Sequence, residues 1–501
     1  MASPLLLVLL ALALSVFSAP QLGSDAPSSA WSTMVGTLPV IDNWEGGDWK
    51  RAEAGPSQQQ QRKGVTVSGR SSGVLSLPVE HVAKPRLFKR DGSDVVNASL
   101  TSRADVSYYV KLSIGNPPQN VSVQLDTGSF ELWVNPDCSK LGPGDNSFCK
   151  AGGRYDAGKS DSAVQTNTQT TLRYGIGSAN ITYVEDDITF PGTDKTIGNV
   201  RFGVATSSKD QFAGILGVGF GNGIAIPYPS FMDQLEKQDV TQSKTLGVAL
   251  GSKDEGGGSV TFGGVDTSKF AGRLAAVPII AAKNSPDRVP RYWVSLQSIS
   301  HSPAGQPGTL LTRGSMDVFL DTGATLTFLP SPVVQAMADA LGSTRTVNGG
   351  LHAVSCRFAN RDDGAFSFRF NGLTVFVPYS EMIRQMPGQP GQRSQCYLGV
   401  MPSDKFALLG DTFLRSCYVV FDLDSSTAYM ARYSNCGSSV QPISKKTSLK
   451  GMPGMCQEPT VAQTRLTNAD DASSAGSGPR RGSRGLAAAV VAAFPLVWVM
   501  V

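Results

Sequence analysis

Hydrophobic and polar residues alternate along most of this chain in short runs. Residues 108–115 alternate in this way, and the Asn-Pro-Pro sequence at 116–118 separates them from a second run at 121–125. Similar runs occur at 170–174, 181–190, 259–263 and 292–298. Alternation with a period of two, broken by turn residues, is typical of β-strands and predicts barrel-like or sandwich-like lobes. Helical patterns are few and lie at 229–238 and 331–341.

Two of the apolar runs end in the same tripeptide, Asp-Thr-Gly. The first copy is Val-Gln-Leu-Asp126-Thr-Gly-Ser and the second is Val-Phe-Leu-Asp321-Thr-Gly-Ala, 195 positions later. Each copy is followed by an apolar pair and a glycine at nearly equal spacing, Gly217 after the first and Gly410 after the second. A repeat of such long period predicts two similar lobes that each contribute one loop to a shared centre.

The repeated aspartates carry the candidate chemistry. Two carboxylates brought together at a lobe interface cannot both stay charged cheaply, so one of them holds a proton. Such a pair offers an acid and a base at once, which suits the attack of water on an amide. Gly128 and Gly323 allow tight loops beside Asp126 and Asp321. The hydroxyls of the intervening threonines, 127 and 322, are expected to brace one loop against the other.

Both ends of the chain resemble targeting signals. Residues 1–19 contain an apolar run at 5–17 and small residues for cleavage, which is typical of a signal peptide. At the other end, small residues at 473–476 precede a polar spacer and an apolar tail at 486–501. This order is that of a GPI-attachment signal, with Ser474 or Gly476 as the attachment residue and 477–501 removed. A short membrane-anchoring tail helix is the alternative.

Composition divides the rest of the chain. Residues 20–90 are rich in Ser, Gln, Gly and Pro and end at the dibasic pair Lys89-Arg90. They are interpreted as a propeptide that a dibasic processing protease removes after Arg90; the alternative is a merely solvated pair. The body of the chain then divides into lobes at 91–265 and 266–436, followed by a Ser-, Gly- and Lys-rich stalk at 437–476.

The remaining counts are consistent with the secretory route. The chain has seven cysteines, and Asn97, Asn120 and Asn180 begin N-glycosylation sequons. A formal charge of +4 over 501 residues gives no reason to expect a nucleic-acid partner. The three histidines are scattered, and no metal-binding or serine-nucleophile motif accompanies them.

These motifs resemble those of the pepsin-like aspartic proteases, in particular the fungal, GPI-anchored, yapsin-like members. The resemblance covers about 106–435 and is carried by 121–134, 317–330 and 408–415. It implies a mostly β, bilobal fold with a central cleft and a β-hairpin flap. It also implies a monomeric endopeptidase without a cofactor, acting on proteins and peptides at the fungal cell surface. A catalytically silent wall-binding homologue and an unanchored secreted protease are the alternatives.

The resemblance also assigns roles around the aspartates. Tyr174-Gly175-Ile-Gly177-Ser matches the flap motif, and Trp133 occupies the place of a tryptophan that hydrogen-bonds the flap tyrosine. Gln124 is expected to make one wall of the substrate pocket more polar. Phe212 and Ile215 complete the pocket residues carried over from the family.

Three positions depart from the family pattern. Phe130 stands where the family commonly has a second serine, Gln124 where many animal relatives have an aliphatic residue, and Ala324 where the second motif usually has Ser or Thr. Ala324 lacks the hydroxyl that its counterpart Ser129 retains, so one carboxyl group loses a hydrogen-bond donor. Losing a donor favours the protonated form, and we expect an activity optimum less acidic than that of an Ala324→Thr enzyme.

The cysteine pairs and the substrate preference also follow from the resemblance. It implies the disulfides Cys138–Cys149 and Cys356–Cys396. The resemblance leaves the pairing of the other three cysteines open: Cys436 with Cys456 in the stalk is one option, with Cys417 as a buried free thiol. Yapsin-like relatives prefer basic residues near the scissile bond. The acidic cleft walls that such a preference needs have two candidates, Asp186-Asp187 close after the flap motif and Asp362-Asp363 in the second lobe. Solvated loops are the alternative for both runs.

Overall fold

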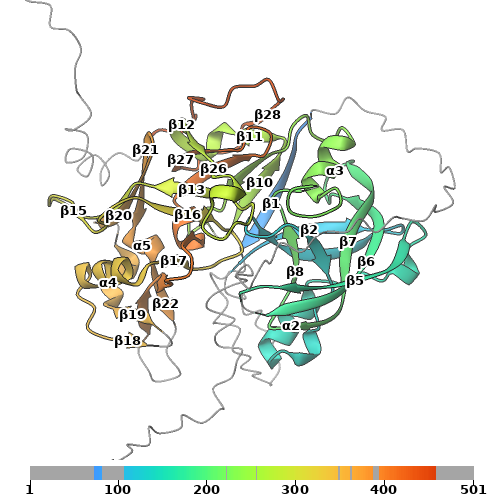
Figure 1. Cartoon of the computed structure of the whole chain (residues 1–501), viewed down its shortest axis with the longest axis horizontal. Coiled ribbons are helices and arrows are strands. Elements are labelled where there is room, and N and C mark those ends of the chain that lie inside the picture. The colour runs from blue at the N-terminus through green and yellow to red at the C-terminus, as the bar shows by residue number, and fades with distance from the viewer. Residues whose placement is uncertain are drawn as a thin grey trace, which may run out of the picture.

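The structure, a computed structural model, describes residues 73–81 and 107–458, apart from 176, 222, 256, 348–349, 362–363 and 387–393. The predicted signal peptide, the cleavage point after Arg90, the sequon at Asn97 and the GPI signal with Ser474 and Gly476 lie outside the described residues. Figure 1 shows the described chain as two strand-rich lobes side by side.

The first half of the chain consists mainly of strands. They are β1 (Leu75–His81), β2 (Tyr108–Ile114), β3 (Gln119–Asp126), β4 (Leu132–Val134), β5 (Val164–Arg173), β6 (Ser178–Thr189), β7 (Thr196–Lys209), β8 (Gly214–Gly217), β9 (Thr245–Ala249), β10 (Gly257–Phe262), β11 (Gly264–Asp266) and β12 (Phe270–Pro278). Two α-helices interrupt them, α2 (Pro143–Ala151) and α3 (Phe231–Lys237). Helix α3 falls within the helical pattern at 229–238, and Ser230 and Asp233 cap its start reciprocally.

The second half repeats this composition. Its strands are β13 (Trp293–Leu296), β14 (Ser298–Pro303), β15 (Thr309–Leu310), β16 (Met316–Leu320), β17 (Thr327–Leu329), β18 (Thr346–Val347), β19 (Leu351–Val354), β20 (Gly364–Phe370), β21 (Leu373–Pro378), β22 (Ile383–Met386), β23 (Gln395–Leu398), β24 (Val400–Pro402), β25 (Leu408–Leu409), β26 (Cys417–Asp422), β27 (Thr427–Tyr433) and β28 (Val440–Pro442). Its helices are α4 (Ser331–Ala340), α5 (Tyr379–Met382) and α6 (Asp411–Leu414). The mostly β prediction is confirmed.

The two lobes share a strand arrangement around the aspartates. In the first, β3 pairs in parallel with β8, β8 pairs antiparallel with β4, and β4 pairs in parallel with β7. In the second, β16, β25, β17 and β24 repeat these three relationships in the same order. The sequence repeat therefore corresponds to a structural repeat, and β8 and β25 are the two apolar-pair segments that follow each Asp-Thr-Gly.

The glycines of these segments are required by close backbone approach. A Cβ atom on Gly217 would lie 2.4 Å from the backbone nitrogen of Glu131. A Cβ atom on Gly410 would lie 2.3 Å from the carbonyl oxygen of Leu326. Real Cβ atoms do not tolerate such distances, so both positions admit only glycine without a backbone shift.

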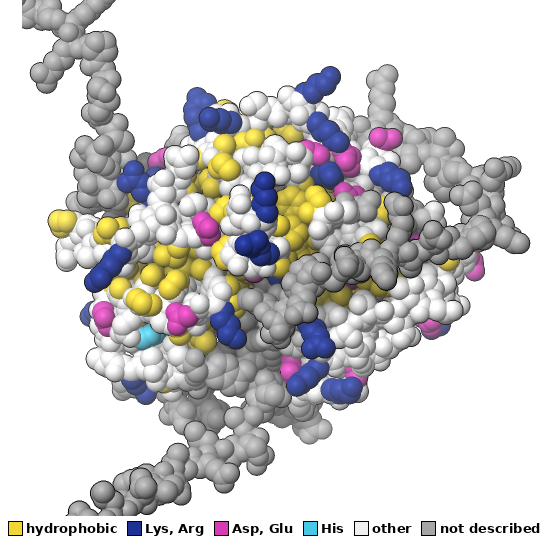
Figure 2. Space-filling model, viewed as in Figure 1, with side chains coloured by type: hydrophobic (Ala, Val, Ile, Leu, Met, Phe, Trp, Pro, Cys, Tyr) yellow, Lys and Arg dark blue, Asp and Glu magenta, His cyan; other side chains and the backbone are white. Residues whose placement is uncertain are grey.

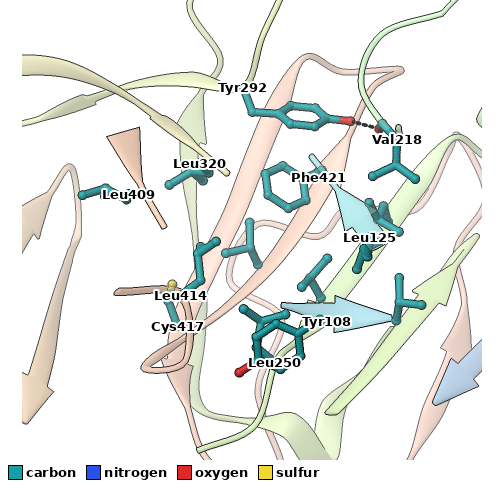
Figure 3. Packing of buried hydrophobic residues seen from close by; sticks show 14 of the residues in the cluster. Tyr108, Leu125, Val218, Leu250, Tyr292, Leu320, Leu409, Leu414, Cys417 and Phe421 are labelled. Atoms are coloured by element: carbon teal, nitrogen blue, oxygen red, sulfur yellow. Dashed lines mark hydrogen bonds between the residues drawn. The ribbon is translucent and has the colours of Figure 1, made fainter. Parts of the chain in front are cut away.

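A sheet of 13 strands joins the lobes, in the order β12-β27-β26-β9-β10-β1-β2-β3-β8-β4-β7-β6-β5. Residues from both halves of the sequence pack in one core cluster. Figure 3 shows Leu125 and Val218 on one side of Tyr292 and Leu320 and Leu409 on the other, with a hydrogen bond of 2.6 Å from the Tyr292 hydroxyl to the Val218 carbonyl. Burial of apolar surface between the lobes therefore fixes their relative position.

Strand β1 belongs to the segment that the sequence predicts to be a propeptide. It pairs with β10 over six residues and with β2 over two. Its alternate side chains Leu75, Leu77 and Val79 are 2–3% exposed. The low-complexity interpretation of 20–90 therefore missed a core strand, although the alternation of these three residues was visible in the sequence.

The first half of the predicted stalk is also folded. Strand β28 pairs with β11, and Ile443 and Leu449 are buried in a core cluster with Phe270 and Tyr418. A disulfide joins Cys436 to Cys456. The boundary predicted at 437 is thus not the end of the packed chain, because isolated apolar residues among serines and lysines anchor 437–458 to the second lobe.

The other cysteines behave as the resemblance implied. Disulfides join Cys138 to Cys149 and Cys356 to Cys396, and Cys417 is a buried free thiol. Each disulfide closes a loop within one part of the fold and stabilises it chiefly by restricting the unfolded chain. In the part of the chain that is described, no helix combines the length and the apolar character needed to cross a membrane.

Candidate active site

The two Asp-Thr-Gly loops face each other at the lobe interface. Strand β3 ends at Asp126, and Asp321 follows directly after β16. Each glycine lies against the opposite carboxyl group: a Cβ atom on Gly128 would be 2.6 Å from Oδ1 of Asp321, and one on Gly323 would be 2.4 Å from Oδ1 of Asp126. Both aspartates are buried, with 2% and 0% exposure. The structure thus brings the two predicted aspartates together, with glycine making room for each.

The threonines form a reciprocal brace, as predicted. The N–H of Thr127 donates to Oγ1 of Thr322 at 3.1 Å, and the N–H of Thr322 donates to Oγ1 of Thr127 at 3.0 Å. Each hydroxyl in turn donates across the interface at 2.9 Å, to the carbonyls of Leu320 and Leu125. Four buried hydrogen bonds therefore hold the loops in one relative position.

The two carboxyl groups differ in their hydrogen-bond donors. Asp126 accepts from the N–H of Gly128 at 2.8 Å and from the Ser129 hydroxyl at 2.6 Å. Asp321 accepts from the N–H of Gly323 at 2.8 Å, but its Oδ2 atom is buried and has no hydrogen-bond partner among the described residues. Ala324 is fully buried and has no hydroxyl to offer, so the asymmetry predicted from the sequence is present.

Burial raises the pKa of both carboxyl groups, but not equally. Burial raises the pKa of Asp126, and the hydrogen bonds from Ser129 and Gly128 oppose this shift. Burial raises the pKa of Asp321 further, to well above its usual range, and the neighbouring Asp126 carboxylate raises it again. Asp321 is therefore the member of the pair that holds a proton, and Asp126 is the one that ionises first.

Gln124 lies in the site but not as a pocket wall. Its side chain is 6% exposed, and its amide nitrogen donates to the carbonyl oxygen of Gly323 at 3.0 Å. Because this donor is used across the interface, Gln124 reinforces the threonine brace. Reading the sequence as a linear motif missed this contact, since its partner is 199 positions away.

The flap motif forms the tip of the hairpin between β5 and β6. The N–H of Tyr174 donates to the carbonyl of Gly177 at 3.0 Å, and Gly177 has a φ of +87°. Trp133 donates its indole N–H to the Tyr174 hydroxyl at 2.7 Å, the contact that the resemblance implied. Gly175 is exposed at this tip. Burial, followed by the Asp126 charge, raises the pKa of Tyr174 well above its usual range, so its hydroxyl stays protonated.

The other pocket residues lie around this hairpin. Ile215 is fully buried in a cluster with Trp133, against which Tyr174 packs. Phe212 is half-buried just before β8. Asp186 does not form an acidic wall, because it is fully buried and accepts hydrogen bonds from Tyr155 at 2.7 Å and Ser162 at 2.6 Å.

The two sequons within the described chain are at exposed asparagines whose side chains are engaged. Asn120 accepts a hydrogen bond from Ser113 at 2.5 Å. Asn180 donates its amide nitrogen to Ser207 at 2.9 Å.

Sequence reasoning missed two charged residues near the site. Glu131 accepts hydrogen bonds from the Tyr183 hydroxyl at 3.0 and 3.1 Å, and burial raises its pKa. Arg291 is 3% exposed and donates to the carbonyl of Gly128. Glu131 lies within the first motif, at 121–134, and a lone charged residue in that apolar run was a signal that the sequence offered. Arg291 lies outside the three motifs, so no signal in the sequence indicated it.

A separate cavity of about 610 Å³ lies between the ends of β12 and β27 and the β20–β21 hairpin. Arg273, Arg369 and Arg432 line it, and Arg432 forms an ion pair with Glu458 at 3.2 Å. Neither Asp-Thr-Gly loop contributes to its walls. Figure 2 shows arginines and lysines dispersed among hydrophobic and acidic side chains over the face in view.

Comparison with known proteins agrees with the geometry of the site. The sequence model of the eukaryotic aspartyl protease family matches residues 107–433. Among curated proteins, the chain is 30% identical over 368 residues to "Probable aspartic-type endopeptidase opsB" of Aspergillus oryzae, covering 70% of this chain and 73% of that protein. It is also 30% identical to candidapepsin of Candida tropicalis, over 74% of this chain and 91% of that protein.

A solved structure has the same fold. The aspartic proteinase from Irpex lacteus superposes with a TM-score of 0.54 at 23% identity, covering 72% of this chain and 98% of that chain. The paired Asp-Thr-Gly loops, the repeated strands around them and the family match from 107 to 433 lead to one conclusion. The chain belongs to the pepsin-like eukaryotic aspartyl protease family and is an aspartic-type endopeptidase.

Proposed function

We propose that this endopeptidase cleaves peptide bonds with a water molecule activated between Asp126 and Asp321. The observation that carries the proposal is the placement of each carboxyl group against the glycine of the opposite loop. Ionised Asp126 takes a proton from the water, while protonated Asp321 donates a hydrogen bond to the carbonyl oxygen of the scissile amide. Attack of the hydroxide then gives a tetrahedral intermediate, and proton transfer to the amide nitrogen releases the new amine.

The flap supplies the substrate contacts in this proposal. Tyr174 is held by Trp133 and lies near enough to Asp126 for the carboxylate charge to raise its pKa. A substrate held between the hairpin and the dyad loses access to bulk water, which strengthens the electrostatic interactions on which the reaction depends.

The cellular form is proposed from the ends of the chain. A signal peptide directs the protein to the secretory route, cleavage after Arg90 converts a zymogen to the active form, and a GPI anchor at Ser474 or Gly476 tethers it at the outer surface, as in yapsin-like enzymes. Similarity to "Secreted aspartic protease 8" of Candida albicans supports only the secretory part of this proposal. An unanchored secreted protease and a catalytically silent wall-binding homologue are the competing forms.

A peptide-library digestion tests the activity. The purified protein is incubated with the library from pH 3 to 7, beside an Asp126→Asn variant as the matched control. Cleavage by the wild type that the variant lacks supports the proposal, and an inert wild type supports the silent homologue. Release of the protein from membranes by a phosphatidylinositol-specific phospholipase distinguishes the anchored from the unanchored form. The same digestion shows whether basic residues are preferred.

A further inference from the structure

A buried arginine connects the two aspartate loops. Arg291 lies just before β13 in the second half of the chain, yet its guanidinium donates to the carbonyl of Gly128 in the first loop. Its neighbour Tyr292 accepts a hydrogen bond at 3.2 Å from the N–H of Leu320, the residue before Asp321. Two consecutive residues therefore contact both loops, one through a side chain and the other through the backbone.

The guanidinium is held rigidly in this position. Its Nε atom forms an ion pair with Asp287 at 2.9 Å, and the two side chains are only 4% and 7% exposed. Trp293 donates its indole N–H to the same carboxylate at 3.0 Å. The rings of Phe130 and Phe319 lie 5.7 and 5.4 Å from the guanidinium carbon. This arrangement uses the flat, permanently charged shape of arginine, which stacks on aromatic faces while its edge donates hydrogen bonds.

The surroundings of Arg291 coincide with the departures from the family pattern. Phe130, which replaces a serine of the first motif, is one of its two ring contacts. Ala324, which replaces a hydroxyl residue of the second motif, leaves Oδ2 of Asp321 without a hydrogen-bond donor among the described residues. The charge of Arg291 opposes the effect of burial at both Asp126 and Asp321 and lowers the pKa of each.

We propose that Arg291 is a positioning residue of the peptidase, which holds the Gly128 loop in place and supplies a fixed positive charge beside the dyad in compensation for the hydroxyl absent at Ala324. The inference rests on the proposed function of Asp126 and Asp321. The titratable and charged groups that face the dyad are the two aspartates themselves, Tyr174 of the flap motif, whose hydroxyl stays protonated, and Arg291. Among them, Arg291 is the one permanent positive charge, since arginine is not deprotonated in proteins. The Ser129 hydroxyl and the N–H groups of Gly128 and Gly323 donate hydrogen bonds to the dyad.

Two variants separate the geometric role from the charge. Arg291→Lys keeps the positive charge but loses the planar edge that contacts Gly128. Its kcat is expected to fall by roughly ten- to a hundredfold, with KM little changed and the acid and alkaline limbs of its pH–rate profile at wild-type positions. Arg291→Met combined with Asp287→Asn removes the charge without leaving a buried carboxylate unpaired. The limbs of this double variant are expected to move to higher pH, because both dyad pKa values rise.

Asp287→Asn alone is the matched control, because it retains Arg291 and its contact with Gly128. The acid and alkaline limbs of its pH–rate profile are expected to lie nearer to those of the wild type than the limbs of the double variant do. Rates are normalised to the folded fraction measured by circular dichroism. An Arg291→Lys enzyme with wild-type kcat, or a double variant whose limbs coincide with those of Asp287→Asn, would overturn the proposal. An inert wild-type protein would instead overturn the proposed function, so the two failures are distinguishable.

Discussion

Thr127 and Thr322 exchange two hydrogen bonds across the lobe interface, each backbone N–H donating to the other residue's hydroxyl at 3.1 and 3.0 Å. Both residues are at most 1% exposed, so neither N–H has access to water as a substitute. Thr127 and Thr322 directly follow Asp126 and Asp321 in the chain. The hydrogen bonds that hold the lobe interface together therefore also fix the relative position of the two aspartates.

Replacing either threonine by valine should destabilise the protein. The change conserves shape but removes a hydroxyl that both donates and accepts, and a buried N–H left without a partner costs about 1–3 kcal/mol. Denaturant unfolding at pH 5 would measure the loss for Thr127→Val, Thr322→Val and the double variant. Each hydroxyl makes two of the four bonds, so the double variant should lose more than either single variant, and any departure from the sum measures the coupling between the two neighbours. Thr196→Val, at an exposed threonine pair, is the control; equal losses there would refute this account.

The pH optimum should respond to the side chain at position 324. Ala324→Thr, or the smaller Ala324→Ser, introduces a donor for the Oδ2 atom of Asp321, which otherwise has no partner among the described residues. A donated hydrogen bond favours the carboxylate and lowers its pKa, so the pH–rate profile should move to more acidic values. Ala338→Ser, in the buried face of α4, provides a control that should leave the profile unchanged. If the pH–rate profile of Ala324→Thr or Ala324→Ser coincides with those of the wild type and Ala338→Ser, the role assigned to Ala324 is wrong.

The raised pKa of Asp321 also predicts how stability depends on pH. An acid whose folded-state pKa lies above its unfolded value, about 3.9, keeps its proton longer in the folded state. Its contribution to stability is present below the unfolded value and is lost as pH rises through the folded value. Asp321→Asn, which is neutral throughout, should therefore melt at a higher temperature than wild type at pH 7 and show no such advantage at pH 3.

Asp404 offers a control of opposite sign. It accepts hydrogen bonds from the backbone and hydroxyl of Ser331, which hold its pKa below the usual value. Asp404→Asn should lower the melting temperature at pH 7 and have little effect at pH 3. Calorimetric scans of Asp321→Asn and Asp404→Asn at pH 3 and pH 7 test the direction of both shifts in melting temperature. An Asp321→Asn protein less stable than wild type at pH 7 would contradict the prediction for Asp321.

Cleavage after Arg90 should leave strand β1 attached. The cut lies between β1 and β2, but β1 remains paired with β10 and buries Leu75, Leu77 and Val79. After digestion by a dibasic-specific protease at pH 7, gel filtration and mass spectrometry should find the fragment ending at Arg90 eluting with the body. Leu77→Asp should weaken this association, whereas Ser76→Asp, at an exposed position, should not. Quantitative separation of the wild-type fragment from a folded body would exclude this role for β1.

The features that were predictable from the sequence are those with a local pattern. The Asp-Thr-Gly copies, the glycines after them and the alternation of β2 and β3 depend on residues close together in the chain, and each is present as expected. Strand β1 was missed because its alternation at Leu75, Leu77 and Val79 is embedded in a polar, Gln-rich segment. The packed residues 437–458 were missed because Ile443 and Leu449 are isolated among polar neighbours.

The supporting contacts of the site were not predictable in the same way. Arg291 reaches Gly128 over 163 positions and Gln124 reaches Gly323 over 199. Neither contact has a signature in the residues that surround it, because each exists only once the lobes have packed. The departure at Ala324 did indicate that the dyad is supported unequally, but it did not indicate which residue compensates.

Loss of activity in Asp126→Asn tests the central claim most directly. The substitution keeps the size of the side chain and one acceptor oxygen for the Gly128 N–H, and the amide nitrogen can donate to the Ser129 hydroxyl in place of the second bond. It removes the base that takes a proton from water. The variant should melt within a few degrees of wild type and bind a pepstatin-like inhibitor more weakly. It should cleave none of the library peptides that the wild type cleaves between pH 3 and 7. A folded Asp126→Asn protein with wild-type peptidase activity would contradict the account.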